Sequence, residues 1–184
     1  MRRVCLIASA SGNGKTTTGR ALAARLGVPF HELDALHHGP DWAPATADEL
    51  RAKVELIVAS PGWVVDGGYR GKIGDIVPKA AELVVWLDLP VHVWLPRLLK
   101  RTARRIVRRE VLWNGNRERL RDVLHPTNSV VLYALRNYRR TRRTLRRELA
   151  RFPLARLRTQ EEVDRFLTDA SARASAARRS TPQP

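Results

Sequence analysis

The stretch Ser9-Ala10-Ser11-Gly12-Asn13-Gly14-Lys15-Thr16 is the most informative part of this 184-residue sequence. It follows an apolar run, Arg3–Ala8, that is typical of a buried strand, and it opens into a helical pattern over Lys15–Leu26. Small residues let backbone N–H groups turn inward around a phosphate, and the helix N-terminus adds the positive end of its dipole. A strand, a loop ending in Gly-Lys-Thr and a helix therefore predict a phosphate-binding P-loop.

This loop predicts a site for ATP and Mg²⁺. Lys15 is expected to reach the β- and γ-phosphates as a point charge, and the Thr16 hydroxyl is expected to ligate Mg²⁺. Ser9 departs from the pattern, because the glycine usual at that position has backbone freedom that serine lacks. A chance Gly/Ser/Thr-rich turn is the poorer interpretation, since strand, loop and helix agree. The residues predicted to hold the nucleotide are Ser11, Gly12, Asn13, Gly14, Lys15, Thr16 and Thr17.

Length and composition favour one cytoplasmic domain. A chain of this length can bury a core of ordinary size, so we predict one kinase-like domain over residues 1–170. The Ala/Ser/Arg/Pro-rich tail, residues 171–184, has little to bury and is expected to be disordered. The single Cys5 cannot form an internal disulfide, which indicates a reducing compartment. No apolar run approaches the ~20 residues of a membrane span, so no membrane partner is expected.

Positive charge is concentrated in one stretch. The formal net charge is +16, and residues 97–147 hold 17 Arg or Lys against three acids. Such a block suits polyanions, which means nucleotide phosphates or a nucleic-acid backbone. A solvated basic surface is the plainer alternative.

Short apolar segments alternate with helical ones, which predicts an α/β fold with a parallel sheet covered on both faces. The predicted strands are Arg3–Ala8, Val28–Leu33, Trp63–Val65, Leu83–Leu87 and Leu154–Leu157. The predicted helices are Lys15–Leu26, Thr46–Ser60, Lys72–Ala81, Val91–Glu110, a stretch ending at His125 before Pro126, Ser129–Arg151 and Gln160–Asp169.

Three predicted strands are followed by aspartate, and parallel strands present their carboxyl ends to the ligand. Asp66 is the best candidate to organise Mg²⁺, because Gly67 and Gly68 follow at once and let a substrate approach the backbone. Asp34 is the next candidate, as a metal-side acid or as a base near the acceptor hydroxyl. Asp88 precedes a proline and is more simply interpreted as a helix cap.

Arginines follow a helical pattern after Val91 and again from Arg136 to Arg147. Two helices with arginine faces, flanking a loop, can form a lid that closes over a polyphosphate. Because phosphoryl transfer is mostly positioning and charge stabilisation, such a lid over residues 97–147 is a candidate catalytic element. The arginines on this face of the first helix are Arg97, Arg101, Arg104, Arg105 and Arg108.

Histidines and a tryptophan near the second predicted strand give weaker indications of function. His31, Asp34, His37 and His38 match no strong zinc pattern and have no supporting Cys pair, so no zinc site is predicted. Trp42 lies in a predicted loop, where packing is the default interpretation and stacking on a base or sugar is the functional one.

Several segments together resemble a known family. Residues 64–70, Val-Val-Asp-Gly-Gly-Tyr-Arg, resemble the D-G-[FN]-[PY]-R segment of adenylate kinases. Residues 33–42, 101–105 and 112–118 resemble the adenylate-kinase-like ATPases often labelled DNA topology modulation proteins. The similarity covers roughly residues 3–167, and shikimate- and gluconate-type kinases resemble this layout too.

The resemblance implies a three-layer P-loop NTPase fold with a five-stranded parallel sheet in the order 2-3-1-4-5 and an arginine lid. It also implies that Arg70 contacts an anionic group of the acceptor, and that Arg101, Arg104 and Arg105 lie at the lid and act in catalysis. With the candidates above, the predicted acceptor site comprises Asp34, Trp42, Gly67, Gly68, Tyr69 and Arg70.

These features predict an ATP-dependent kinase of the nucleotide type that phosphorylates an anionic or hydroxylated small molecule. A nucleoside monophosphate and a hydroxylated metabolite both remain open as the acceptor. The rival is an ATP-binding regulator associated with nucleic acid through residues 97–147, although no recognisable reading motif is present. A plain NTP switch, with slow hydrolysis that no acceptor accelerates, is the third alternative.

Overall fold

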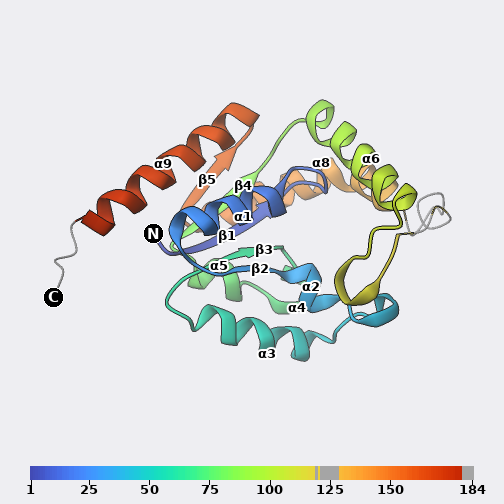
Figure 1. Ribbon diagram of the computed structural model, residues 1–184, viewed down its shortest axis with the longest axis horizontal. Coiled ribbons are helices and arrows are strands. Elements are labelled where there is room, and N and C mark those ends of the chain that lie inside the picture. The colour runs from blue at the N-terminus through green and yellow to red at the C-terminus, as the bar shows by residue number, and fades with distance from the viewer. Residues whose placement is uncertain (119, 121–128, 180–184) are drawn as a thin grey trace.

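The computed structural model describes residues 1–118, 120 and 129–179. Within that part of the chain, five strands form one parallel sheet in the order β2-β3-β1-β4-β5, as expected (Figure 1). The strands are β1 (Arg3–Ala8), β2 (Phe30–Glu32), β3 (Trp63–Asp66), β4 (Leu83–Leu87) and β5 (Leu154–Leu157). This arrangement confirms the predicted α/β fold class.

Helices cover both faces of the sheet (Figure 1). The α-helices are α1 (Lys15–Leu26), α2 (Leu33–His37), α3 (Ala47–Val58), α4 (Arg70–Ile73), α5 (Ile76–Ala80), α6 (Val91–Val107), α8 (Val130–Glu148) and α9 (Gln160–Arg179). The 3₁₀ turns are η1 (Pro40–Trp42), η2 (Trp113–Gly115) and η3 (Leu149–Arg151). The result is the predicted three-layer architecture.

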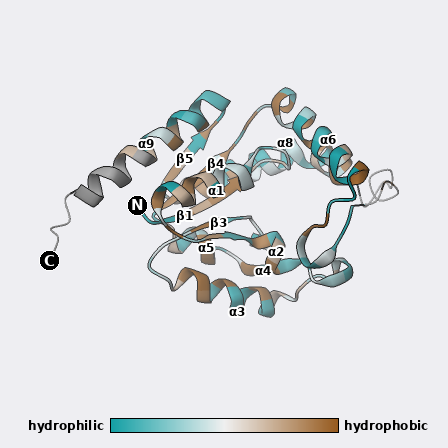
Figure 2. Ribbon diagram, in the orientation of Figure 1, coloured by the Kyte–Doolittle hydropathy of each residue, from teal (hydrophilic) through white to brown (hydrophobic). Residues whose placement is uncertain are grey.

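Two apolar cores lie on opposite faces of the sheet. Val4 and Leu6 of β1 pack in one cluster, which includes Leu22 of α1 and Val163 of α9. Cys5 and the next alternate residue, Ile7, pack in the other cluster with residues of α3, α5 and α8. Because both faces are covered, β1 is apolar after Arg3, and Figure 2 shows most of this strand in the hydrophobic colour.

The second strand ends earlier than predicted. β2 stops at Glu32, and Asp34 lies in the first turn of α2. Leu33 and His37, one helical turn apart, are both buried, so helix geometry directs two side chains inward at this point. Glu32, and not Asp34, is therefore the acid at the carboxyl end of β2.

Other boundaries differ in smaller ways. The segment predicted as one helix over Lys72–Ala81 forms α4 and α5, separated at Gly74, whose φ of 62° breaks the helix. α6 ends at Val107, before the predicted Glu110. The predicted helical stretch up to His125 lies mostly outside the described residues.

The last helix is longer than predicted. α9 continues past Asp169 to Arg179, so the backbone in this part of the expected disordered tail is helical. Alanine and arginine, which are frequent after Asp169, both have high helix propensity. Residues 180–184 lie outside the described part. No helix in the described ranges is long and apolar enough to cross a membrane.

Candidate active site

The loop between β1 and α1 has the backbone that a phosphate cradle requires. Gly12 and Gly14 have φ values of 86° and 84°, in the left-handed region that favours glycine. A Cβ atom at Gly12 would lie 2.4 Å from the carbonyl oxygen of Trp94. No side chain caps the N-terminus of α1, so its amides are not occupied by a side chain. An anion such as the triphosphate of ATP fits this cradle.

Asn13 fixes the loop from within. Its Nδ2 atom donates to the Ala10 carbonyl oxygen at 2.9 Å, and its Oδ1 atom accepts from the Leu89 backbone N–H at 2.9 Å. The side chain is buried. Because both polar atoms of its side chain form hydrogen bonds within the protein, Asn13 can contact a nucleotide only through its backbone.

Ser9, at the first position of the loop, is also held by hydrogen bonds. Its hydroxyl donates to Oδ1 of Asp88 at 2.7 Å and accepts from Nε1 of Trp86 at 2.9 Å. Its φ is not in the left-handed region, so this backbone does not require glycine. The serine thus supplies a buried polar anchor at a position where the usual pattern has glycine.

Asp88 is a buried connector between the loop, α8 and β5. Its carboxylate accepts from Nε of Arg142 and from Nε of Arg156, each at 2.9 Å. The hydrogen bond from Arg142 to this carboxylate raises the pKa of the guanidinium. The interpretation of Asp88 as a helix cap is wrong, because α6 starts after Pro90 without a side-chain cap. Its carboxylate pairs with two arginines instead.

Oxygen atoms gather beside Lys15. The Thr16 hydroxyl lies 2.8 Å from Oδ2 of Asp66 and 3.0 Å from Oε1 of Glu32. Nζ of Lys15 lies 3.4 Å from Oδ1 of Asp66. One hydroxyl proton can serve only one of the two carboxylates, so two anionic groups converge on one oxygen. A hard cation that prefers oxygen ligands and keeps several waters, as Mg²⁺ does, fits this group.

This oxygen group is not a complete metal cage. In the described ranges, no cluster of three or more His, Cys, Asp or Glu side chains is arranged to hold a metal ion. Mg²⁺ typically binds one or two carboxylates together with substrate phosphates and water. The arrangement therefore suits a cation that arrives with a nucleotide.

Sequence reasoning missed Glu32. The signal was present, because a carboxylate at the carboxyl end of a parallel strand was the criterion that selected Asp66. Because the predicted strand ran to Leu33, this criterion pointed to Asp34, two residues further along the chain. With the observed end of β2, the same criterion selects Glu32.

A cavity of about 530 Å³ adjoins the loop and brings several predicted residues together. Lys15 and Asp34 line it with the Gly67–Gly68–Tyr69–Arg70 segment. The opposite wall is one face of α8. The residues that α8 contributes are Tyr133, Ala134, Asn137, Tyr138, Thr141, Leu145 and Glu148. We call this space the α8 cavity.

Asp34 is held in place at the edge of the α8 cavity. The Tyr69 hydroxyl donates to its Oδ1 atom at 2.6 Å and lies 3.4 Å from Nε2 of His38. Burial and the charge of Asp34 raise the pKa of Tyr69, so this hydroxyl stays a donor. Tyr69 has a φ of 30°, a strained backbone for a non-glycine residue. Strained backbone conformations of this kind are typical of residues at functional sites.

Arg70 is paired within the protein. Its Nε atom donates to Oδ1 of Asp75 at 2.7 Å, and its NH1 group pairs with Glu148 of α8. Its side chain is 15% exposed. Two carboxylates therefore neutralise the guanidinium that the resemblance assigned to an anionic group of the acceptor.

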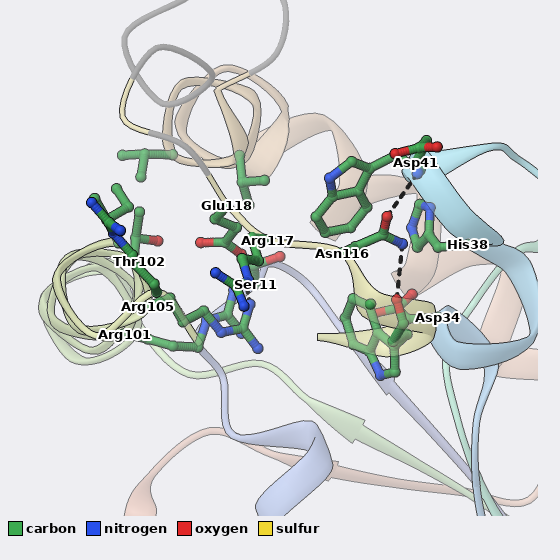
Figure 3. A pocket seen from close by; sticks show the side chains of 17 residues that line it. Ser11, Asp34, His38, Asp41, Arg101, Thr102, Arg105, Asn116, Arg117 and Glu118 are labelled. Carbon is green, nitrogen blue, oxygen red and sulfur yellow. Dashed lines mark hydrogen bonds and ion pairs between the residues drawn. The ribbon is translucent and has the colours of Figure 1, made fainter. Parts of the chain in front are cut away.

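A second, larger cavity of about 1030 Å³ lies between α6 and the segment that follows β2. We call it the arginine cavity, because Arg101 and Arg105 of α6 line it and point inward in Figure 3. Ser11 and Asp34 line this cavity and the α8 cavity alike. The two spaces therefore meet beside the phosphate loop.

The predicted lid arginines have different environments. Nε of Arg101 and Nε of Arg105 are buried and have no hydrogen-bond partner within the described part of the chain. Burial, followed by the charge of Arg105, lowers the pKa of Arg101. Arg105 also pairs with Glu118 at 2.6 Å. Arg104 is exposed, pairs with Glu110 at 2.8 Å and is not among the residues that line either cavity.

Aromatic side chains form the far wall of the arginine cavity. The rings of His38 and Trp113 stack with centroids 5.9 Å apart, and Trp42 meets Trp113 edge-on. Asn116 holds this wall together, because it accepts from the Trp42 backbone N–H and donates to the Gly39 carbonyl oxygen. Trp42, predicted for the acceptor site, thus lines the arginine cavity and not the α8 cavity.

Comparison with known proteins defines the fold class. No family model matches the sequence, and no curated protein matches it. Among solved structures, shikimate kinase from Acinetobacter baumannii in complex with shikimate is similar, with a TM-score of 0.59 and 18% identity over 96% of this chain and 94% of that one. A gluconokinase from Sinorhizobium meliloti 1021 has a TM-score of 0.51 and 21% identity over 96% and 93% of the two chains.

Deoxyadenosine kinase from M. mycoides with bound dCTP is also similar, with a TM-score of 0.51 and 11% identity over 92% of this chain and 99% of that one. All three are P-loop kinases that act on small molecules. At these identities the likeness concerns the fold. The chain therefore has the fold of the small-molecule P-loop kinases, as the resemblance implied.

Proposed function

We propose that this protein transfers the γ-phosphate of ATP to a hydroxyl group of a small molecule. One observation carries the proposal: Ser11 of the phosphate loop and Asp34 line both cavities, and Lys15, which lines the α8 cavity, lies 3.4 Å from Asp66 of the Thr16–Asp66–Glu32 oxygen group. Kinase catalysis needs an anion cradle, a cation site and a proton acceptor near the nucleophile. The fold of the similar kinases supports the same activity.

When bound, MgATP would supply the phosphoryl group and a divalent positive charge. The α1 N-terminus and Lys15 hold the phosphate oxygens, and Thr16 with Asp66 and Glu32 holds the cation directly or through water. Arg101 and Arg105, with buried Nε groups that lack partners in the described chain, compensate negative charge from the arginine cavity. Tyr69 holds Asp34 by Oδ1, so that Oδ2 can accept the proton of the acceptor hydroxyl.

The regulator associated with nucleic acid is the weaker proposal. Some arginines of the basic stretch already have carboxylate partners within the protein, among them Arg104, which pairs with Glu110, and Arg142, which pairs with Asp88. The similar structures are kinases of small molecules and give this alternative no support.

The test follows the γ-phosphate itself. The protein is incubated with Mg²⁺ and ATP labelled at the γ-phosphate, with a panel of hydroxylated metabolites, nucleosides and nucleoside monophosphates. Label that moves to one small molecule, and depends on that molecule for its rate, supports the proposal. Label found only as inorganic phosphate, at a rate that changes with duplex DNA alone, would contradict it.

A further inference from the structure

We propose that the acceptor is an uncharged molecule with several hydroxyl groups, such as a sugar or a nucleoside, and not a molecule that carries phosphate or carboxylate. This inference rests on the proposed function, because it names the class of acceptor for the same reaction. The α8 cavity is the acceptor site in this account, and its volume of about 530 Å³ suits one small molecule.

The cationic side chains that line the α8 cavity already have carboxylate partners within the protein. Lys15 lies 3.4 Å from Asp66 and faces the phosphate cradle. Arg70 is held between Asp75 and Glu148. Among the described residues that line this space, no other Lys or Arg is present. An anionic group of an acceptor would be desolvated here without a free positive partner, which is costly.

The carboxylates in the same lining make an anion still less suitable. Asp34 and Glu148 both face the α8 cavity, so its two positive and two negative side chains balance formally. Asp75, behind Arg70, pairs with both Arg70 and Arg151, so it adds no free cation to this wall. A carboxylate of the protein that faces an anionic group of a ligand repels that ligand, and such repulsion excludes wrong ligands. The electrostatics of this wall therefore favour an uncharged acceptor over an anionic one.

The remaining polar groups are those that recognise hydroxyl groups. Asn137 and Thr141 of α8 and Ser11 of the loop contribute amide and hydroxyl groups to the lining. At Gly68, an added Cβ would meet no atom within 4 Å, so the backbone here is open to a ligand. A site built from hydrogen-bonding groups selects strongly for hydroxyl partners, because unmatched polar groups are costly when buried.

The two cavities thus divide the charges between them. Arg101, whose buried Nε has no hydrogen-bond partner in the described chain, lines the arginine cavity, where a polyphosphate would need it, and Arg105 beside it is shared with Glu118. Asp34 lies where the two spaces meet, and its carboxylate can accept a hydroxyl proton without first meeting another anion. This division explains why the arginine-rich stretch does not by itself indicate an anionic acceptor.

The experiment compares pairs of acceptors that differ mainly in an anionic group. The pairs are adenosine and AMP, ribose and ribose 5-phosphate, and glucose and gluconate. For each member, kcat/KM is measured from acceptor-dependent ADP formation by the full chain with MgATP. In every pair that reacts, the uncharged member is expected to have a kcat/KM at least ~10-fold higher. A higher value for the anionic member would overturn the inference.

Failure of this inference and failure of the proposed function give different results. ATP hydrolysis that requires Lys15 but that no uncharged acceptor accelerates overturns the inference about the acceptor alone. ADP formation that is unchanged in Lys15→Ala overturns the proposed function, and the inference with it.

A matched pair of variants tests the location of the site. Thr141→Arg adds a cation to the lining of the α8 cavity, whereas Thr144→Arg adds one to an exposed position of the same helix. Thr141→Arg is expected to raise kcat/KM for the anionic members relative to the uncharged ones by ~10-fold, and Thr144→Arg is not. Equal effects of the two variants would overturn the assignment of the α8 cavity to the acceptor.

Discussion

The hydroxyl of Ser9 donates a 2.7 Å hydrogen bond to the buried carboxylate of Asp88, 79 residues further along the chain. The bond joins the start of the phosphate loop to the carboxyl end of the neighbouring strand, β4. Because Arg142 and Arg156 also bind Asp88, the loop is connected to α8 and β5. The position of the cradle thus depends on side chains from four separate segments.

Removal of this anchor is expected to destabilise the fold. Ser9→Ala leaves Nε1 of Trp86 without its buried acceptor, which should lower the free energy of unfolding by about 1–3 kcal/mol in urea titrations. Asp88→Asn should cost about 3 kcal/mol, near the lower limit for a buried pair, because the Arg142 side chain is 44% exposed. Thr144→Ala, on an exposed surface, is the control. An unchanged midpoint for Ser9→Ala would contradict the role of Ser9.

Glu32 is expected to control the demand for Mg²⁺. In Glu32→Gln, the oxygen group around Thr16 loses one negative charge. The Mg²⁺ concentration for half-maximal activity should rise about tenfold, the usual effect of losing a group that supports a metal ligand. Glu55→Gln, on the exposed face of α3, should leave it unchanged. If the Mg²⁺ dependence is the same in both variants, Glu32 has no part in holding the cation.

Tyr69 is expected to act through Asp34. Tyr69→Phe removes the 2.6 Å hydrogen bond that orients the carboxylate, and kcat should fall about 10- to 100-fold with little change in KM. A double-mutant cycle separates this role from direct contact with the substrate. In an Asp34→Asn background, Tyr69→Phe should have little further effect, because the group that it orients is already lost. Additive effects of the two substitutions would show that Tyr69 acts independently.

The stability of the protein should decrease in acid. Burial, followed by the charges of Lys72 and His38, lowers the pKa of His37 below its ordinary value of 6.5. The unfolded chain therefore binds the proton more readily, and the free energy of unfolding should fall as the pH decreases below about 6.5. Burial lowers the pKa of His31 in the same direction.

Unfolding measured between pH 7 and pH 5 checks this dependence. The slope should be smaller in His37→Gln than in the natural sequence, whereas His92→Gln, at an exposed position of α6, should retain the full slope. A slope that His37→Gln does not alter would assign the acid sensitivity to other groups.

Local patterns were sufficient to predict much of the fold. The P-loop motif, the apolar runs and the acid at the end of β3 each depend on neighbours in the sequence, and the sheet order followed from the resemblance. Thr46 and Glu49, at the start of α3, are likewise close in the sequence, and the structure contains both hydrogen bonds of a capping box between them. The end of β2 could not be predicted from the local sequence, because the start of α2 at Leu33 depends on burial of its side chains against the core.

Pairings between distant residues could not be predicted. Arg70 meets Glu148 across 78 residues, and nothing in either local sequence indicates that the pair forms. That contact changes the interpretation of the site, since it neutralises a cation expected to bind the acceptor. The different environments of Arg104 and Arg105 follow likewise from how α6 packs and not from the arginine pattern.

The central claim, that the phosphate loop drives transfer from ATP to an acceptor, is tested most directly at Lys15. Acceptor-dependent ADP formation should fall by at least ~100-fold in Lys15→Ala, because the loop loses its point charge on the phosphates. The variant should retain its folded circular dichroism spectrum, and Lys53→Ala, at an exposed position of α3, should retain full activity. Undiminished, acceptor-dependent ADP formation in Lys15→Ala would contradict the account.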